Sequence, residues 1–268
     1  MRKFLALKSF GDTVIACHHL RALASPEDEL VCAGHLRSLL VALGYPGAVS
    51  WLANGENGVP AFFDIRKHGV WAALKSATRL KRSILTTRSA GDSIVFDRLG
   101  WRQRYLAAGM PCEDVVAGTH NIYLDYEAFF GRVHPGVVGC GCVRGVVGIF
   151  PDSRIAAKEL PEPLVQAVSE CLKAAGYDFR VVRAGDGREI STFEGLVETV
   201  QSFSGIVSAD SLPAHLAEYF GKPSFVFSPA PNPYWLPKSA YLNGNHSIFG
   251  APLDGLQRWI LNREEMVA

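Results

Sequence analysis

The sequence predicts an α/β protein made of two halves, each with a parallel sheet flanked by helices. Short apolar runs alternate with longer stretches of helical period along the chain of 268 residues, as they do in βαβ units. Several of the helical stretches end at a glycine, which is a common helix stop. A segment rich in Gly and Pro without amphipathic period, residues 131–142, divides the chain and is typical of an interdomain linker.

The first half begins with a short apolar strand at residues 3–7 and a turn at 8–12. Asp12 is expected at the N-cap of a helix over 13–24, where an Asp stabilises the helix by about 1 kcal/mol. Further strands are expected at 29–33, 50–53, 62–65 and 83–87, and further helices at 35–43, 70–80 and 100–109. Asp12 also fits a second interpretation, a functional carboxylate at the C-terminal end of the first strand, where open α/β sheets bind their ligands.

The second half restarts with a buried strand within 143–150. Helices are expected at 162–175, 193–201 and 250–263, and a strand at 178–183. We therefore place one domain at residues 1–138 and a second at 139–250. Residues 251–268 form a terminal helix that we expect to pack back toward the first domain.

The most informative stretch is strand, polar turn, helix and strand over residues 205–228. The turn is Ser208 to Ser211, and Pro213 lies just inside the helix start, where its missing N–H is not needed. The backbone N–H groups at such a helix start and the helix dipole favour anions. The stretch therefore predicts an anion site, with Asp210 and His215 on either side of it. His215 fits two roles equally, a ligand of the anion or a buried histidine bonded to the turn.

Composition excludes several classes of protein. A net charge of +1 argues against a broad basic face for nucleic acid, and no apolar run reaches the length of a membrane span. The six cysteines lack zinc-ligand spacing and favour a reducing cytoplasm. No paired acidic motif suggests a metal, and we expect no metal and no cofactor.

A basic cluster is either a solvated face or a site for an anionic acceptor or membrane surface. It comprises Lys75, Arg79, Lys81, Arg82, Arg88, Arg98, Arg102 and Arg104.

Three motifs add a family resemblance. They are Lys8-Ser-Phe-Gly-Asp12, Gly148-Ile-Phe-Pro-Asp-Ser-Arg-Ile-Ala-Ala-Lys158-Glu-Leu-Pro161 and Val207-Ser-Ala-Asp-Ser-Leu-Pro-Ala-His-Leu-Ala217. Together they resemble glycosyltransferase family 9, the bacterial heptosyltransferases that use ADP-heptose to build the lipopolysaccharide core. The resemblance implies a GT-B fold, which is two Rossmann-like domains facing each other across a cleft. It also implies metal-independent, inverting transfer of a sugar.

The resemblance assigns roles to particular residues. It implies that Asp12 is the catalytic base. On the acceptor side it implies a set of three residues, Lys8, Arg66 and Arg79. The residues expected to bind the donor, a nucleotide-diphosphate sugar, are Ser153, Arg154, Lys158, Glu189, Asp210, Ser211, Leu212 and His215. Lys158 is the expected charge partner of the diphosphate.

Three residues at two places depart from the family pattern and keep alternatives open. The family's His-Pro-Gly is Phe150-Pro151-Asp152 here, and Leu212 stands where the family has glycine. The main hypothesis is a transferase that moves heptose from ADP-heptose to a lipopolysaccharide-core-like or other anionic acceptor. It would act in the cytoplasm, in peripheral contact with the inner membrane. The alternatives are a relative that has lost donor binding and serves as a scaffold or subunit, and a transferase for a protein or small-molecule acceptor.

Overall fold

The computed structural model describes residues 1–52, 58–132, 145–184 and 191–265, with side chains described up to 261. The chain divides into two compact units, each described separately below. Unit 1 contains residues 1–119 and 125–133, and unit 2 contains residues 120–124 and 134–268.

Unit 1 is built on a parallel five-stranded sheet in the order β3-β2-β1-β4-β5. The strands are β1 (Arg2–Ala6), β2 (Asp28–Ala33), β3 (Val49–Leu52), β4 (Ser93–Phe96) and β5 (Cys112–Asp114). The chain builds outward from β1 in one direction and then returns to place β4 on the other side of β1. The strand order therefore reverses between β1 and β4, and ligands of open α/β sheets bind beside the carboxyl ends of the strands at such a point.

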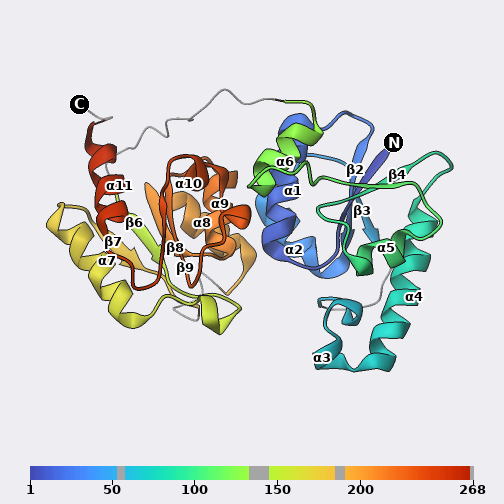
Figure 1. Ribbon diagram of the computed structural model, residues 1–268, viewed down its shortest axis with the longest axis horizontal. Helices are drawn as coiled ribbons and strands as arrows, with labels where there is room; N and C mark the ends of the chain where they lie inside the picture. The colour runs from blue at the N-terminus through green and yellow to red at the C-terminus, as the bar shows by residue number, and fades with distance from the viewer. Residues whose placement is uncertain (53–57, 133–144, 185–190, 266–268) are drawn as a thin grey trace. The chain divides into compact units, whose positions relative to one another are not determined.

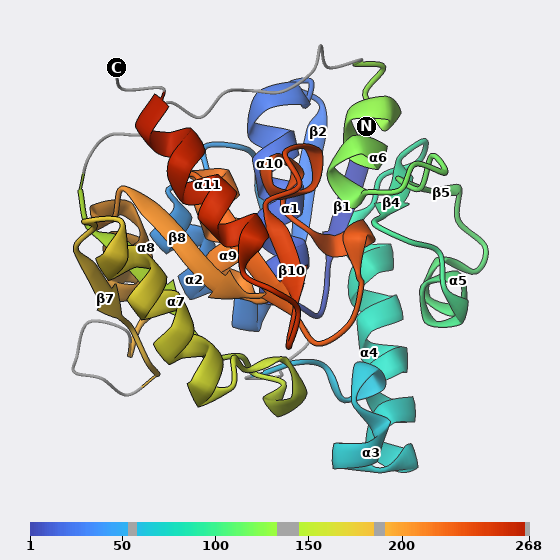
Figure 2. The same cartoon turned by 60° about the vertical axis from the view of Figure 1, so that its left-hand side comes forward.

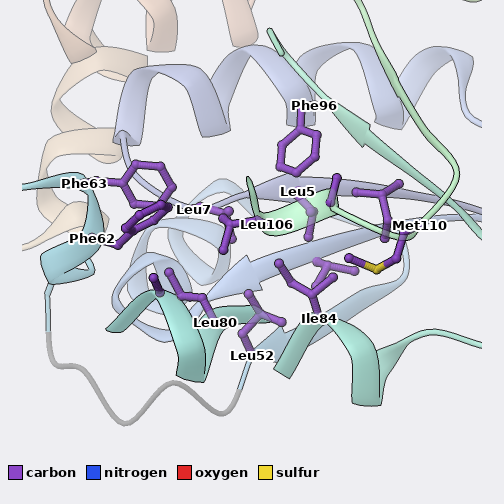
Figure 3. Packing of buried hydrophobic residues seen from close by; sticks show 14 residues of the cluster. Leu5, Leu7, Leu52, Phe62, Phe63, Leu80, Ile84, Phe96, Leu106 and Met110 are labelled. Carbon is purple, nitrogen blue, oxygen red and sulfur yellow. The ribbon is translucent and has the colours of Figure 1, made fainter. Parts of the chain in front are cut away.

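The helices of unit 1 cover both faces of this sheet (Figure 1). They are α1 (Phe10–Leu23), α2 (Arg37–Leu43), α3 (Ile65–His68), α4 (Val70–Thr87), α5 (Trp101–Ala107) and the larger part of α6 (Ile122–Phe129), whose residues 122–124 belong to unit 2, with 3₁₀ turns at Gly34–Leu36 and Ala61–Phe63. Right-handed crossovers place α1 and α2 on one face and α4 and α5 on the other. Leu80 and Ile84 of α4 pack with Leu5, Leu52 and the other members of one buried cluster (Figure 3).

Unit 2 repeats the architecture with a parallel sheet in the order β10-β9-β8-β6-β7. Its strands are β6 (Val147–Phe150), β7 (Phe179–Val181), β8 (Gly205–Ala209), β9 (Ser224–Ser228) and β10 (His246–Ile248). Its helices are α7 (Glu162–Ala174), α8 (Phe193–Ser202), α9 (Leu212–Tyr219), α10 (Lys238–Leu242) and α11 (Asp254–Glu265). The strand order reverses between β6 and β8, and α7 and α11 lie on one face of the sheet (Figure 2).

The C-terminal helix α11 contributes to the core of unit 2. Leu256, Trp259 and Ile260 are buried in the same cluster as Phe225 and Phe227 of β9, and the rings of Phe225 and Trp259 lie 6.1 Å apart. The expected packing of this helix toward the first domain stays a prediction. The predicted linker lies almost entirely outside the described residues, as does the predicted boundary at residue 138.

The expectation of two α/β halves with parallel sheets is confirmed, but two predicted strands are wrong. Residues 62–65 form the end of a 3₁₀ turn and the start of α3, and residues 83–87 complete α4. The β-branched and aromatic residues of both segments favoured a strand. In 83–87 the helical spacing of buried side chains, Leu80, Ser83 and Ile84, continues across the segment, so packing overrides local propensity.

Candidate functional site

The switch point of unit 2 holds an ion pair between two of the predicted site residues. Asp210 directly follows β8, and Lys158 ends a 3₁₀ turn, Ala156–Lys158, in the segment after β6. The Lys158 Nζ lies 2.7 Å from Asp210 Oδ2, and Asn232 Nδ2 donates to the same oxygen at 3.4 Å. The Asp210 side chain is 5% exposed and that of Lys158 is 30% exposed. The carboxylate is thus buried and compensated, while part of the cation reaches solvent.

Helix α9 begins two residues after Asp210 in the sequence. Ser211 is the N-cap residue, and no side chain caps the helix. The Ser211 Oγ donates to the carbonyl oxygen of Ala209 at 3.3 Å, and the Ala214 N–H donates to the carbonyl oxygen of Ser211 at 3.2 Å. Leu212 is half-buried. The backbone of the turn is therefore held in place from within, as a preformed helix start requires.

His215 lies one turn into α9 and is held by a tyrosine. Its Nδ1 and the hydroxyl of Tyr123 are 3.0 Å apart in a buried hydrogen bond, and both residues belong to unit 2. Burial lowers the pKa of His215 to about 4 and outweighs the nearby Asp210 carboxylate, which raises it. The imidazole is therefore neutral at pH 7. The hydrogen bond to the turn's backbone that one interpretation predicted is replaced by this bond to a tyrosine 92 residues earlier.

The segment that carries Tyr123 is fixed by a neighbouring amide. Asn121 donates through Nδ2 to the carbonyl oxygens of Pro233 at 3.0 Å and Leu236 at 2.9 Å. Its Oδ1 accepts from the Tyr123 N–H at 3.0 Å. Asn121 is fully buried, so its amide orients Tyr123, and through it His215, with little freedom.

The turn after β6 holds the residues expected near the phosphates. Asp152 accepts from the Ala184 N–H at 2.5 Å and from Arg183 Nη1 at 3.5 Å, so its carboxylate is bonded toward the end of β7. Ser153 Oγ accepts from the Ile155 N–H at 3.3 Å, and Arg154 is exposed. The Asp152 carboxylate, which stands where the family has a glycine, is therefore compensated by the Arg183 guanidinium. Glu189 lies outside the described residues.

A second carboxylate that the sequence did not point to lies at the switch point of unit 1. Asp97 directly follows β4, while Asp12 lies in the first turn of α1, which follows β1. Because β1 and β4 are neighbours, both carboxylates reach the same edge of the sheet. Burial and the nearby Asp12 carboxylate raise the pKa of Asp97 to about 7. The expected N-cap role of Asp12 is wrong, since Ser9 is the N-cap and Asp12 lies three residues later.

One aromatic residue, Tyr126, contacts the Asp97 carboxylate of this pair. The Tyr126 hydroxyl donates to Asp97 Oδ1, which opposes the rise in the pKa of Asp97. The Tyr126 ring stacks on His19, with centroids 4.9 Å apart and planes at 2°. Tyr126 is 1% and His19 2% exposed. Burial of the Asp97 carboxylate beside this stacked pair favours its protonated form.

The expected acceptor-side residues are Lys8, Arg66 and Arg79, and all three belong to unit 1 and are exposed. The Lys8 carbonyl oxygen lies 3.2 Å from His35 Nε2. Arg66 lies on α3 and Arg79 on α4. Within the ranges that the structure describes, no group of His, Cys, Asp and Glu side chains is arranged to hold a metal ion.

Solved structures with the same architecture cover nearly the whole chain. The E. coli heptosyltransferase WaaC with ADP-2-deoxy-2-fluoro heptose superposes with a TM-score of 0.60 at 13% identity over 99% of this chain and 100% of WaaC. The E. coli ADP-heptose LPS heptosyltransferase II gives 0.57 at 14% identity over 98% and 99% of the two chains. A family 9 glycosyltransferase from Veillonella parvula gives 0.58 at 13% identity over 99% and 94%.

The chain has the fold of the GT-B glycosyltransferases. No protein-family model and no curated protein matches its sequence. At 12–14% identity the likeness establishes the fold, whereas the chemistry depends on the side chains at the two switch points.

Proposed function

We propose that the chain is an inverting glycosyltransferase that moves a sugar from a nucleotide-diphosphate donor to a hydroxyl group of an anionic acceptor. ADP-heptose is the favoured donor and a lipopolysaccharide-core-like glycolipid the favoured acceptor, at the cytoplasmic face of the inner membrane. One observation carries the proposal. A partly exposed lysine, paired with a buried aspartate, lies at the switch point of unit 2 beside the amino end of a helix. The fold is shared with WaaC, whose structure holds ADP.

The donor side supplies positive charge for a leaving diphosphate. Lys158 would move from Asp210 onto the phosphate oxygens, assisted by the hydroxyl of Ser153, the guanidinium of Arg154 and the dipole of α9. Once Lys158 has turned toward the phosphates, Asp210 can accept hydrogen bonds from the sugar. Ser211 and Leu212 at the start of the helix bring the backbone close to the phosphates.

His215 would act on the donor as a neutral hydrogen-bond donor. Its pKa of about 4 keeps it uncharged at pH 7. When Tyr123 donates to Nδ1, the proton of the imidazole is on Nε2 and is available to an oxygen of the diphosphate. The predicted role of Glu189 near the ribose is part of the same proposal.

The acceptor side supplies the base. In the transfer step the acceptor oxygen attacks the anomeric carbon while the bond from that carbon to the phosphate oxygen breaks. The nucleoside diphosphate leaves with the bonding electron pair, and Asp12 takes the proton of the attacking hydroxyl. The Asp12 carboxylate raises the pKa of the neighbouring Asp97, so the two carboxyl groups share a proton before both ionise. Lys8, Arg66 and Arg79 would attract an anionic acceptor.

The test is a screen of nucleotide sugars in which released nucleoside diphosphate is measured. The wild type should turn over with at least one donor. Asp12→Asn should lose about 10²–10⁴-fold in kcat while its affinity for the nucleoside diphosphate stays near that of the wild type. Asp254→Asn is the matched control, because Asp254 is an exposed carboxylate in the first turn of α11. Transfer that persists in Asp12→Asn would remove the assignment of the base.

Calorimetry with ADP separates the scaffold alternative from the transferase. Lys158→Met should weaken ADP binding, whereas Lys173→Met on the exposed face of α7 should not. If the wild type shows neither heat nor thermal stabilisation with any nucleotide, the chain is a relative that has lost its donor. If donors are turned over but no glycolipid accepts the sugar, the acceptor is a protein or a small molecule.

A further inference from the structure

Helix α4 carries apolar side chains on two opposite faces. Its inner face buries a set of small and aliphatic residues against the sheet of unit 1, namely Ala73, Ser76, Ala77, Leu80, Ser83 and Ile84. Trp71, Leu74 and Leu85 lie outside this stripe and are 85%, 51% and 49% exposed. Their spacing of three and eleven residues places them together on the outward side of the helix. A surface helix ordinarily presents polar residues there.

The surroundings of this face are strongly basic. The segment 65–88 covers α3, α4 and Arg88. It contains seven of the 27 Lys and Arg residues of the chain and none of its 26 Asp and Glu residues. The rest of the chain therefore holds 20 basic and 26 acidic residues. Lys75 and Arg82 lie on the same outward side of α4, Lys75 one turn from Trp71 and Arg82 one turn from Leu85. Within the described chain, neither of them forms an ion pair with a carboxylate.

We propose that the outward face of α4, defined by Trp71, Leu74, Lys75, Arg82 and Leu85, docks on the anionic surface of a lipid bilayer. Large apolar side chains flanked by Lys and Arg are the composition of helices that lie in the membrane interface. Tryptophan favours the headgroup level, and anionic lipids attract the basic residues. None of the described helices combines the length and apolar character that crossing a bilayer requires, so the contact would be peripheral.

A second copy of the chain is a poorer occupant of the same face. A two-fold interface brings the same patch of each copy together. Lys75 and Arg82 of one copy would therefore lie against the same residues of the other, with no carboxylate in residues 65–88 to compensate them. An anionic bilayer neutralises these charges and accepts the apolar side chains at the same time. The choice of a bilayer also rests on the proposed function, because a glycolipid acceptor is presented at a membrane surface.

Co-sedimentation with vesicles tests the proposal without donor or acceptor, so its failure is separate from a failure of the transferase assignment. One set of vesicles contains phosphatidylcholine alone, and the other equal parts of phosphatidylcholine and phosphatidylglycerol. The wild type should bind the second set and lose binding as salt rises. Lys75→Gln with Arg82→Gln should weaken binding about 25-fold, since each basic residue near an anionic surface contributes about five-fold. Arg258→Gln, at an exposed position of α11, is the control.

The apolar residues are tested separately. Trp71→Ser with Leu74→Ser should abolish binding while the melting temperature stays unchanged, because both side chains are exposed. Val41→Ser on α2, a residue that is 67% exposed, should bind as the wild type does. Equal binding to both vesicle types, or unchanged binding of the Trp71 and Leu74 double variant, would overturn the proposal. So would sedimentation velocity that shows a wild-type dimer which this double variant converts to a monomer.

Discussion

Replacing Asp97 with asparagine should make the protein more stable above neutral pH. The pKa of Asp97 is raised from 3.8 to about 7 by burial and by Asp12. Between these pH values the folded protein binds more protons than the unfolded chain, so the free energy of unfolding falls as pH rises. At 1.36 kcal/mol for each pKa unit, ionising Asp97 in the folded protein costs at most about 4 kcal/mol. Partial exposure of the side chain and its coupling to Asp12 reduce the expected gain to about 2 kcal/mol.

Urea denaturation of the wild type and Asp97→Asn at a series of pH values measures this effect. The two free energies of unfolding should be similar below about pH 3.8, and the variant should become progressively more stable than the wild type up to about pH 7, above which the difference should stay constant. Taking the difference between the two proteins removes the contribution of other titrating groups. Asp12→Asn should move the titration of Asp97 to lower pH, because it removes the neighbouring carboxylate. Tyr126→Phe should move it to higher pH, because it removes the hydroxyl that donates to Asp97.

The same variant reports on catalysis. In the wild type, the acidic limb of the profile of kcat/KM against pH should lie near 7, where the second of the two protons of Asp12 and Asp97 dissociates. In Asp97→Asn, which removes the group that titrates near 7, the limb should move toward the ordinary range of a single carboxyl group, about 4. A wild-type stability curve that runs parallel to that of Asp97→Asn, together with an unshifted acidic limb, would refute the coupling of the two carboxylates.

Three further predictions concern unit 2. Lys158→Met should lower the free energy of unfolding by about 2 kcal/mol in urea, less than the about 3–5 kcal/mol of a fully buried pair, and Asp210→Asn should restore part of it. The free energy of unfolding of the wild type should fall by about 3 kcal/mol as the pH drops from about 6.5 to about 4, because His215 binds a proton in the unfolded chain but not in the folded protein. His215→Gln should remove this fall, and an unchanged slope of stability against pH would contradict a neutral His215. Gly148→Ala should destabilise by about 1–3 kcal/mol, because the new Cβ would lie 2.4 Å from Phe203 Cδ2, and Phe203→Ala should relieve this cost if the clash is the cause.

The strand, turn, helix and strand of unit 2 were predictable because their signals are local. β8 and β9 are continuous buried runs of five residues each. Between them lie a polar turn and Pro213, and Gly221 with φ of 66° ends α9 as predicted. Each of these features is determined by neighbours within a few residues, so one sequence is sufficient to place them.

Asp97 and Tyr123 show what local signals do not reveal. β4 has only four residues, and the β-branched residues at 83–87 favour a strand there although the strand lies at 93–96. The pattern therefore does not mark Asp97 as the residue after a strand, although the turn at Gly91 and Asp92 before Ser93 indicates where β4 starts. The bond between Tyr123 and His215 joins residues 92 positions apart, and no spacing in the sequence predicts it.

The two switch points compensate their carboxylates in different ways, and this difference fits the donor and acceptor sides that we propose. Asp210 is balanced by the cation of Lys158, so the proposed diphosphate would meet a positive charge already in place in unit 2. Asp97 has no comparable cation in an ion pair within the described residues, and a proton compensates it up to about pH 7. A site that binds an anionic leaving group needs the first arrangement. A site that removes a proton from a hydroxyl group near neutral pH needs the second.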